Sequence, residues 1–372
     1  MKTLIIFSHT KLEDMIEKGN LDYISYYEKY FDRVYVLYMA GNKNKVIRNG
    51  KILYISKNFN NEFLNLFLSP FKLYNFYKKH KKAKFLTADM IFSWYVTLLL
   101  KFTDRKIYLM PVAIPSEIYK SSGKSMTGIL PFWIESFFIR LSIYSCNYIY
   151  TSINGKFYEK ELNLNNSLKD KFIMSEISVD ELPNKVFYEP KIKREQSDNI
   201  NLIYVGRLHE EKLVKDIIHI FSIVNQKVQN ANLYLIGNGS EEKKLKKLVI
   251  KYGLEKKVFF EGYKNNVEIK NYLDNSDIFI SPLTGTSLRE AFLRQIPVVA
   301  YDIDWVKTMF KHRYHLLKSE KGDFKTFAGN IIELTKNDEL RDELSKNAYE
   351  LGINRWGLDK LRSSLQYTFD RD

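Results

Sequence analysis

The stretch SPLTGTSLREAFLRQIPVVAYDIDW, from Ser281 to Trp305, contains the pattern that decides the fold. It follows an apolar run, turns at Gly285, continues as a short helical segment, and ends in a second apolar run and an acidic loop. Apolar runs of strand length on both sides of a helix are typical of a β-α-β unit with buried parallel strands. A single acid, Glu290, lies on the predicted helix.

The same alternation extends in both directions along the chain. In the C-terminal half, strands are predicted at 201–206, 232–237, 257–263, 278–283 and 296–302. In the N-terminal half, they are predicted at 3–8, 33–39, 51–56, 88–94, 106–112 and 147–152. The helix after the strand at 201–206 is predicted to bury a face that contains Ile217, Ile218, Phe221 and Val224. This alternation predicts an α/β protein with two Rossmann-like domains, each a doubly wound parallel sheet, that face a cleft.

The domain boundary is predicted in the polar segment YEPKIKREQSDN. We expect an N-terminal domain at 1–187, a linker at 188–199 and a C-terminal domain at 200–355. The last segment, 356–372, is predicted to be a helix that packs back on the N-terminal domain. Two open α/β sheets joined in this way bind ligands outside the carboxyl ends of their strands, so the cleft is the expected site.

Composition limits the classes of protein and of partner. The single cysteine, Cys146, excludes an internal disulfide framework and fits a reducing cytoplasm. The N-terminus has a five-residue apolar run, too short for a signal peptide, and the apolar segment 127–146 contains Glu135 and Arg140, which argues against a spanning helix. The net charge of +14 favours an anionic partner, but no nucleic-acid-binding motif accompanies it. We therefore predict a cytoplasmic protein that does not bind nucleic acid.

A group of cations follows the first strand of the C-terminal half. In YVGRLHEEK (204–212), Gly206 ends the strand, and Arg207 and Lys212 follow on the loop. An arginine fork and a lysine ammonium on such a loop can hold a diphosphate. The alternative is two solvent-exposed cations of a basic protein, and position alone does not decide between these interpretations.

The opening stretch adds a second anion site. The first amides of a helix lack helical partners and carry partial positive charge, so the turn at 284–287 can bind phosphate. Gly285 allows close approach, Thr286 or Ser287 is a candidate cap, and Leu288 continues the first turn. Glu290 can accept two hydrogen bonds from a vicinal diol such as that of ribose. The alternatives are an ordinary capped turn and a solvent-facing glutamate.

Taken together, these motifs resemble the retaining glycosyltransferases of the GT-B fold, in particular family four, the glycogen-synthase-like group. The resemblance covers about residues 200–345 and rests on VGRLHEEK, on LYLIGNGSEEKKLKKLVIKYGLEKKVFFEGY and on REAFLRQIPVVAYD. It implies that Arg207 and Lys212 bind the donor diphosphate and that Glu290 binds the ribose. It also implies that Tyr263 meets the nucleotide base and that backbone amides at Gly285, Thr286, Ser287 and Leu288 meet the phosphates.

One position departs from the family pattern. Family members usually carry another glutamate, which touches the donor sugar, eight residues before Glu290, where this chain has Pro282. Some members have a similar turn with an acidic loop, here at 301–305, which makes Asp302 a candidate contact for the sugar. An ordinary loop acid is the alternative for Asp302. His9 and the turn at Lys18 and Gly19 are the candidates on the acceptor side, and His9 is as readily an ordinary loop histidine.

The resemblance implies a hexosyltransferase that uses a nucleotide-sugar, with UDP-sugar favoured, and that needs neither metal nor bound cofactor. The implied acceptor is a glycan or lipid-linked glycan of a cell-surface polysaccharide such as capsule or lipopolysaccharide. Basic and aromatic segments at 62–85 and 127–146 suit peripheral docking on an anionic membrane surface, with a core helix as the alternative. A nucleotide-sugar epimerase or hydrolase of the same fold, a degenerate partner subunit, and a non-catalytic basic scaffold or nucleic-acid-binding protein remain as other interpretations.

Overall fold

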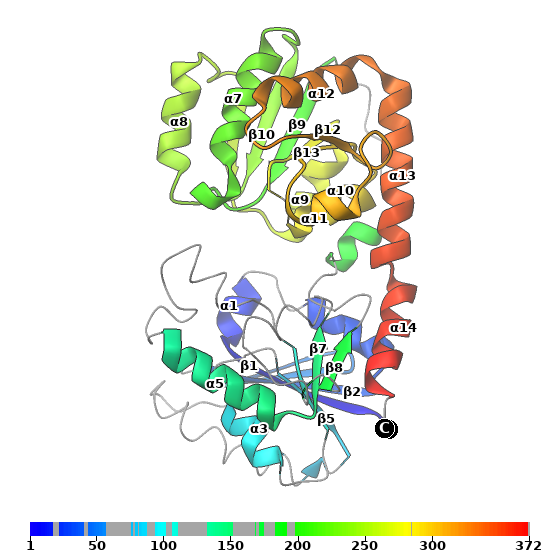
Figure 1. Ribbon diagram of the computed structural model, residues 1–372. Helices are drawn as coiled ribbons and strands as arrows, with labels where there is room; N and C mark the ends of the chain where they lie inside the picture. Colours follow the sequence, from blue (N-terminus) through cyan, green and yellow to red (C-terminus); the bar gives the residue numbers. More distant parts are fainter. Residues whose placement is uncertain are drawn as a thin grey trace. The chain divides into compact units, whose positions relative to one another are not determined.

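The computed structural model divides the chain into two compact units. Unit 1 comprises Met1–Asp180 and Asp359–Asp372, and unit 2 comprises Glu181–Leu358 (Figure 1). The structure describes residues 1–17, 22–40, 44–56, 76, 79–80, 82–87, 94–101, 106–110, 132–151, 168, 171–174, 183–191, 198–283 and 285–370. Each unit is built around its own sheet, with strands alternating with helices.

The described strands of unit 1 form a sheet with the order β3-β4-β2-β1-β5-β6-β7-β8. Their bounds are β1 Thr3–Lys11, β2 Arg33–Ala40, β3 Lys45–Asn49, β4 Ile52–Ser56, β5 Lys84–Thr87, β6 Ile107–Leu109, β7 Tyr148–Thr151 and β8 Phe172–Met174. The described helices are α1 Leu12–Glu17, the 3₁₀ helix η1 Asp22–Lys29, α3 Trp94–Lys101 and α5 Phe132–Ser145. Every described pairing is parallel except the β3–β4 hairpin, whose turn has Gly50 at a φ of 56°.

The C-terminal helix α14, Leu358–Phe369, is anchored on unit 1 by aromatic contacts. The ring of Phe369 lies 4.6 Å from that of Tyr108 and 5.1 Å from that of Phe31, measured between centroids. Lys2 adds an exposed ion pair with Asp370 at 3.2 Å. The aromatic contacts are the stronger attachment, because an exposed ion pair contributes at most about 1 kcal/mol.

Unit 2 contains a fully parallel sheet with the order β11-β10-β9-β12-β13-β14 among its described strands. The strand bounds are β9 Ile200–Val205, β10 Ala231–Ile236, β11 Val258–Gly262, β12 Ile278–Ser281, β13 Val298–Tyr301 and β14 Leu317–Ser319. The helices are η4 Lys185–Tyr188, η5 Glu210–Lys212, α7 Val214–Asn225, α8 Glu242–Lys251, α9 Asn266–Asp274, α10 Thr286–Leu293, α11 Asp304–Met309, α12 Phe324–Lys336 and α13 Asp338–Trp356. Figure 1 shows α7, α8 and α12 grouped along this sheet.

The core of unit 2 lies between the sheet and α7, α8 and α12. Leu202, Leu233 and Ile278 from three neighbouring strands are fully buried in one cluster with the apolar face of α7. The predicted face of α7 is confirmed, because Ile217, Ile218, Phe221 and Val224 are all buried. Burial of such side chains contributes about 1.5–3 kcal/mol each, so this face rather than local helix propensity stabilises α7.

Arg294, at the end of α10, joins this helix to α9 by a buried ion pair and to the segment before the sheet of unit 2 by hydrogen bonds. Arg294, which directly follows α10, is completely buried and makes two hydrogen bonds with Asp274, at 2.6 and 2.8 Å. The same guanidinium also donates to the backbone carbonyls of Phe187, Glu189 and Pro190. Because the buried charge is paired and hydrogen-bonded, removing either partner would leave an uncompensated charge in the core at the C-terminal end of α10.

The two predicted parallel sheets are confirmed, but individual strands differ from the prediction. The strand expected at 88–94 is wrong at Trp94, which begins α3; β5 lies just before it at Lys84–Thr87, and residues 88–93 are outside the described part. Strands β3, β8 and β14 were not predicted, because each is only three to five residues long, too short for a periodic pattern to identify. Among the helices that the structure describes, none is both long and apolar enough to cross a membrane.

Candidate functional site

The site is formed where the central strands of unit 2 end. Strands β10, β9 and β12 are neighbours and run parallel, so the loops that follow Ile236, Val205 and Ser281 leave the same edge of the sheet. In an open α/β sheet this carboxyl edge is where ligands bind. Arg207, Lys212, Gly285 and Glu290 therefore belong to adjacent loops and helix starts of one sheet.

The loop after β9 lies directly against the loop after β10. The amide of Leu208 donates to the carbonyl of Asn238 at 2.9 Å, and the amide of Glu241 donates back to the carbonyl of Leu208 at 3.0 Å. A Cβ atom added to Gly237 or Gly239 would lie 2.1 Å from a carbonyl oxygen of the β9 loop. These glycines are thus required for the close approach, and the signal that identifies them is the G-x-G that follows a strand.

Tyr204 fixes the backbone of the cationic loop from inside the core. Its ring is buried, and its hydroxyl donates to the carbonyl of Arg207 at 3.1 Å. Burial raises the pKa of Tyr204, so the hydroxyl keeps its proton and remains a donor. Gly206 lies against this tyrosine, because a Cβ at Gly206 would be 2.5 Å from the hydroxyl oxygen. The sequence alone did not identify Tyr204, because its hydrogen bond to Arg207 depends on how the loop after β9 turns.

The two predicted phosphate-binding cations are on this braced loop. The Arg207 side chain is 67% exposed and lies 3.5 Å from the carboxylate of Glu211, an exposed pair that holds the guanidinium only weakly. Lys212 ends η5 and is half-buried, and Leu213 after it adopts a left-handed φ of 54° that turns the chain into α7. The guanidinium of Arg207 is therefore accessible on a loop whose backbone is fixed.

The start of α10 is fastened to the end of β9. Gly285 is the N-cap, has extended backbone and provides no side-chain cap. The expectation that Thr286 or Ser287 caps the helix is wrong: Ser287 is in the first turn, and its hydroxyl donates to the carbonyl of Val205 at 2.8 Å. The side chain of Leu288 is fully buried and therefore belongs to the core. Its amide donates to the backbone carbonyl of Gly285 at 3.3 Å.

Glu290 lies in the second turn of α10 and is 8% exposed. Burial raises the pKa of its carboxyl to about 7, and the neighbouring Arg289 partly offsets this effect. A carboxyl group with such a pKa changes its ionisation near neutral pH. Its burial next to a helix start is unusual for a purely structural glutamate and is typical of a group with a ligand.

Two further candidates lie at the same edge but farther from β9. Tyr263 follows β11 and is 56% exposed, directly after Gly262, which has a φ of 69° and accepts a hydrogen bond from the amide of Gly237 at 2.8 Å. Asp302 follows β13 and forms an ion pair with Lys318 at 2.8 Å. If Asp302 contacts the sugar, its carboxylate must therefore bind the sugar and Lys318 at the same time.

The acceptor-side candidates are in unit 1. His9 lies within β1, which extends to Lys11 through an irregularity after Ser8, and not in a loop after the strand as both interpretations assumed. Its role on the acceptor side stays a prediction. Lys18 and Gly19 are outside the described residues. The predicted placement of the site in a cleft between two domains stays a prediction.

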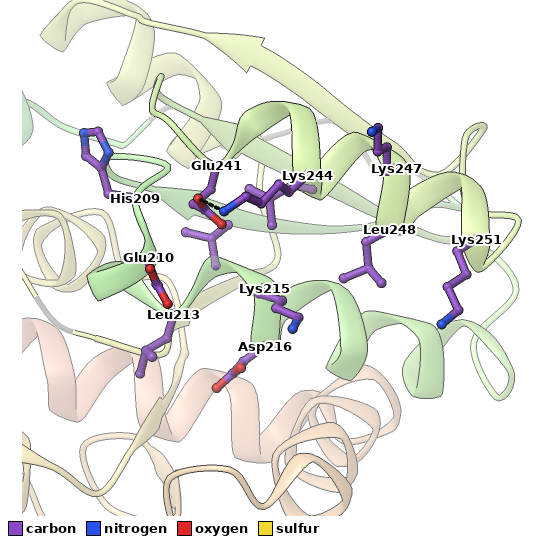
Figure 2. Close-up of a pocket in the computed structure, with 12 residues that line it drawn as sticks. His209, Glu210, Leu213, Lys215, Asp216, Glu241, Lys244, Lys247, Leu248 and Lys251 are labelled. Carbon is purple, nitrogen blue, oxygen red and sulfur yellow. Dashed lines mark hydrogen bonds and ion pairs between the residues drawn. The ribbon is translucent and has the colours of Figure 1, made fainter.

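A cavity of about 560 Å³ lies beside the cationic loop, between the start of α7 and the length of α8 (Figure 2). Its lining contains His209, Glu210 and Asp216 together with four lysines. Lys244 is paired with Glu241 at 2.8 Å, as Figure 2 shows. Neither Arg207 nor Glu290 lines this cavity, so it is not the predicted donor site itself, although His209 and Glu210 of the cationic loop belong to its lining. In the described part of the chain, no group of three or more His, Cys, Asp or Glu side chains could hold a metal ion.

Comparison with known proteins gives a family match for part of the chain and several similar structures. Residues 188–351 match the family model Glycosyl transferases group 1. A sequence search of curated proteins finds no significant match. The chain is similar in structure to sucrose-phosphate synthase from Thermosynechococcus elongatus, with a TM-score of 0.71, 13% identity and coverage of 100% of this chain and 99% of that one.

Two other similar structures contain bound molecules. Anabaena Alr3699/HepE in complex with UDP has a TM-score of 0.69 and 14% identity, over the full length of both chains. S. aureus TarM, in complex with fondaparinux, alpha-GlcNAc-glycerol and UDP, has a TM-score of 0.63 and 19% identity over 82% of this chain, which spans 58% of the TarM chain. The chain therefore has the GT-B fold of glycosyltransferases, with two Rossmann-like domains, and its unit 2 matches the Glycosyl transferases group 1 family.

Proposed function

We propose that this protein transfers a hexosyl group from a nucleotide-diphosphate-sugar to a glycan or lipid-linked glycan, with retention of configuration. The observation that carries the proposal is the hydrogen bond between Ser287 Oγ and the carbonyl of Val205 at 2.8 Å. It joins the helix start that is suited to phosphate to the strand end that precedes Arg207. Two anion-binding elements fixed to each other form a preorganised site for a diphosphate.

Several findings support a UDP-sugar as donor. The HepE structures contain UDP and UDP-glucose, and the TarM structure contains UDP. The match to Glycosyl transferases group 1 covers both the cationic loop and α10. In this proposal Arg207 and Lys212 contact the diphosphate, Glu290 accepts hydrogen bonds from the ribose, and Tyr263 meets the base.

In the proposed reaction, the bond between the anomeric carbon and the diphosphate oxygen breaks, and a bond to the acceptor oxygen forms on the same face. The acceptor hydroxyl proton passes to the departing diphosphate. Charge accumulates on that leaving group in the transition state, and fixed cations and amides stabilise it there. The proposal needs no metal ion, because two cationic side chains and a helix start supply positive charge.

A thermal-shift screen of UDP-, GDP-, ADP- and TDP-sugars tests the donor. A ligand at 100 times its Kd stabilises the folded state by about 2.7 kcal/mol. For a domain of this size that raises Tm by roughly 5–10 °C, and we expect UDP-sugars to do so. If none of the four classes shifts Tm, the proposal is contradicted. Rapid release of nucleotide without an acceptor would instead favour a hydrolase or epimerase.

We also propose that unit 1 contacts an anionic membrane surface, as a lipid-linked acceptor of capsule or lipopolysaccharide synthesis would require. On α5, Trp133, Phe137, Arg140 and Tyr144 follow each other at helical spacing and are all exposed, with Trp133 at 72% and Phe137 at 60%. The opposite face of α5 packs Ile139 and Ile143 into the core. An exposed aromatic and basic stripe of this kind suits the membrane interface.

Liposome flotation tests the membrane contact. We expect the protein to float with vesicles that contain anionic lipid at low salt, and the double variant Trp133→Ser, Phe137→Ser to float much less. Tyr314→Ala, an exposed aromatic of unit 2, is the matched control and should float as the wild type does. Equal flotation of all three proteins, or none with any vesicle, would refute the contact. Most of the basic segment 62–85 is outside the described residues.

A further inference from the structure

A second cavity of unit 2 lies away from the carboxyl edge of the sheet. It has a volume of about 250 Å³ and is lined by Asn201, Tyr234, Asn271, Tyr272, Asn275 and Ser276. Asn201 is the second residue of β9, whereas Arg207 lies two residues beyond its last residue, Val205. Since a strand rises about 3.3 Å per residue, the two ends of β9 are about 17 Å apart. The cavity is therefore distinct from the proposed donor site.

The wall of this cavity is an aromatic surface that α9 covers incompletely. Tyr234 stacks on Phe259 of the neighbouring strand with 5.0 Å between centroids and 20° between planes. Tyr272 of α9 completes the group at 6.2 Å from Tyr234. The Tyr272 hydroxyl donates to Glu261 at 2.6 Å, which fixes its ring. Tyr234 and Tyr272, which both line the cavity, thus present apolar ring surface at a polar opening, and Phe259 supports Tyr234 from the neighbouring strand.

Side-chain amides surround these rings. Asn201 donates through Nδ2 to the carbonyl of Asn275 at 3.1 Å, while its Oδ1 is buried and accepts no hydrogen bond from the described residues. An acceptor in that state costs free energy unless a ligand or water donates to it. Asn271 is exposed at the rim. The Nδ2 groups of Asn201 and Asn275 already donate to backbone carbonyls, so the exposed side-chain amide of Asn271 is the group that offers a donor and an acceptor at the rim.

None of the six lining residues is charged, in a chain with a net charge of +14 and 27% charged residues. The Lys264 ammonium lies 5.7 Å from the centroid of the Tyr272 ring, but no charged side chain lines the cavity itself, so a neutral ligand fits this lining better than a phosphate or carboxylate does. A sugar ring matches this lining, because its C–H faces pack on aromatic rings while its hydroxyls both donate to and accept from amides. We propose that this cavity is a binding site for a neutral glycan, separate from the donor site.

The test measures binding of maltohexaose, laminarihexaose and chitohexaose to the full chain by saturation-transfer NMR and titration, with excess UDP. We expect at least one of them to bind. Tyr234→Ala should weaken that binding about tenfold, and Tyr234→Phe, which keeps the ring, should weaken it far less. Asn271→Ala, at an exposed helix position, should weaken it about fivefold without unfolding the protein. Tyr314→Ala is the matched control and should bind as the wild type.

Three outcomes would overturn the proposal: no oligosaccharide binds, Tyr234→Ala and Asn271→Ala bind like the wild type, or UDP displaces the oligosaccharide. Uridine binding that Tyr234→Ala abolishes, without oligosaccharide binding, would also overturn it and would indicate a nucleoside site. The measurement needs no catalysis. Its failure would therefore leave the proposed transferase activity untouched, and failure of that activity would leave this site untouched.

Discussion

Replacing Arg207 with alanine is expected to lower kcat for nucleotide-sugar turnover by about 10²–10³-fold. Its guanidinium is on a loop whose carbonyl is fixed by Tyr204, and in the proposed reaction it stabilises charge that develops on the departing diphosphate. The described ion pair of Arg207, with Glu211 at 3.5 Å, is exposed, so the substitution should leave the free energy of unfolding almost unchanged. Steady-state rates and Tm, measured on the same preparation, separate the two effects.

Lys215→Ala is the matched control for this prediction. Lys215 follows the cationic loop in α7 and lines the separate cavity of Figure 2, so its removal changes the net charge without touching the proposed diphosphate site. We expect turnover close to that of the wild type. Turnover of Arg207→Ala within a factor of two or so of the wild type would contradict the assigned role, and an equal loss in Lys215→Ala would indicate a general charge effect.

Replacing Glu290 with glutamine is expected to weaken donor binding and, at the same time, to stabilise the protein. Loss of charge-assisted hydrogen bonds to the ribose should raise the Kd of the donor by about 10- to 100-fold. Burial raises the pKa of Glu290 from 4.5 to about 7, so ionising this carboxyl in the folded state opposes folding. Above pH 7 this opposition amounts to about 3 kcal/mol, and glutamine removes it.

The raised pKa of Glu290 makes the free energy of unfolding depend on pH. The folded protein keeps the Glu290 proton up to about pH 7, whereas the unfolded chain releases it near pH 4.5. The contribution of Glu290 to the free energy of unfolding therefore falls as the pH rises through this window. Glu290→Gln should raise Tm at pH 8 and have little effect on Tm at pH 4.5. Donor binding by the wild type should improve as the pH rises through 7, because the ionised carboxylate is the better acceptor.

Glu333→Gln provides the opposite case within unit 2. Arg313 holds the pKa of Glu333 below its ordinary value through hydrogen bonds at 2.7 and 3.0 Å. Glutamine at this partly buried position should lower Tm slightly at pH 8 and leave donor binding unchanged. If Glu290→Gln also lowered Tm at pH 8, the interpretation of Glu290 as a destabilising group retained for a ligand would be wrong.

Unit 2 could be predicted from the sequence because its strands are apolar runs separated by helices with clear apolar faces. The strand β9 and the buried face of α7 follow from these two patterns alone. By contrast, β14 has three residues, Leu-Lys-Ser, and no periodic pattern can identify a strand so short. β5 follows a lysine-rich segment, and its signal is weaker than that of the apolar residues after it.

The residue types of the candidate site could be predicted, but not the contacts that fix them. Arg207, Gly285 and Glu290 were identified because loops and helix starts at one sheet edge have known chemistry. The hydrogen bond from Tyr204 to the Arg207 carbonyl depends on how the chain turns after β9. The bond from Ser287 to Val205 joins residues that are 82 positions apart, which no local pattern reveals. The local rule for helix capping failed at Ser287 for the same reason.

The most direct test of the central claim is an experimental structure of the protein with a bound UDP-sugar. We expect the diphosphate within hydrogen-bond distance of Arg207, Lys212 and the first amides of α10, and the ribose hydroxyls on the carboxylate of Glu290. A diphosphate bound elsewhere, with Arg207 and Glu290 free of contact to the nucleotide, would contradict the account.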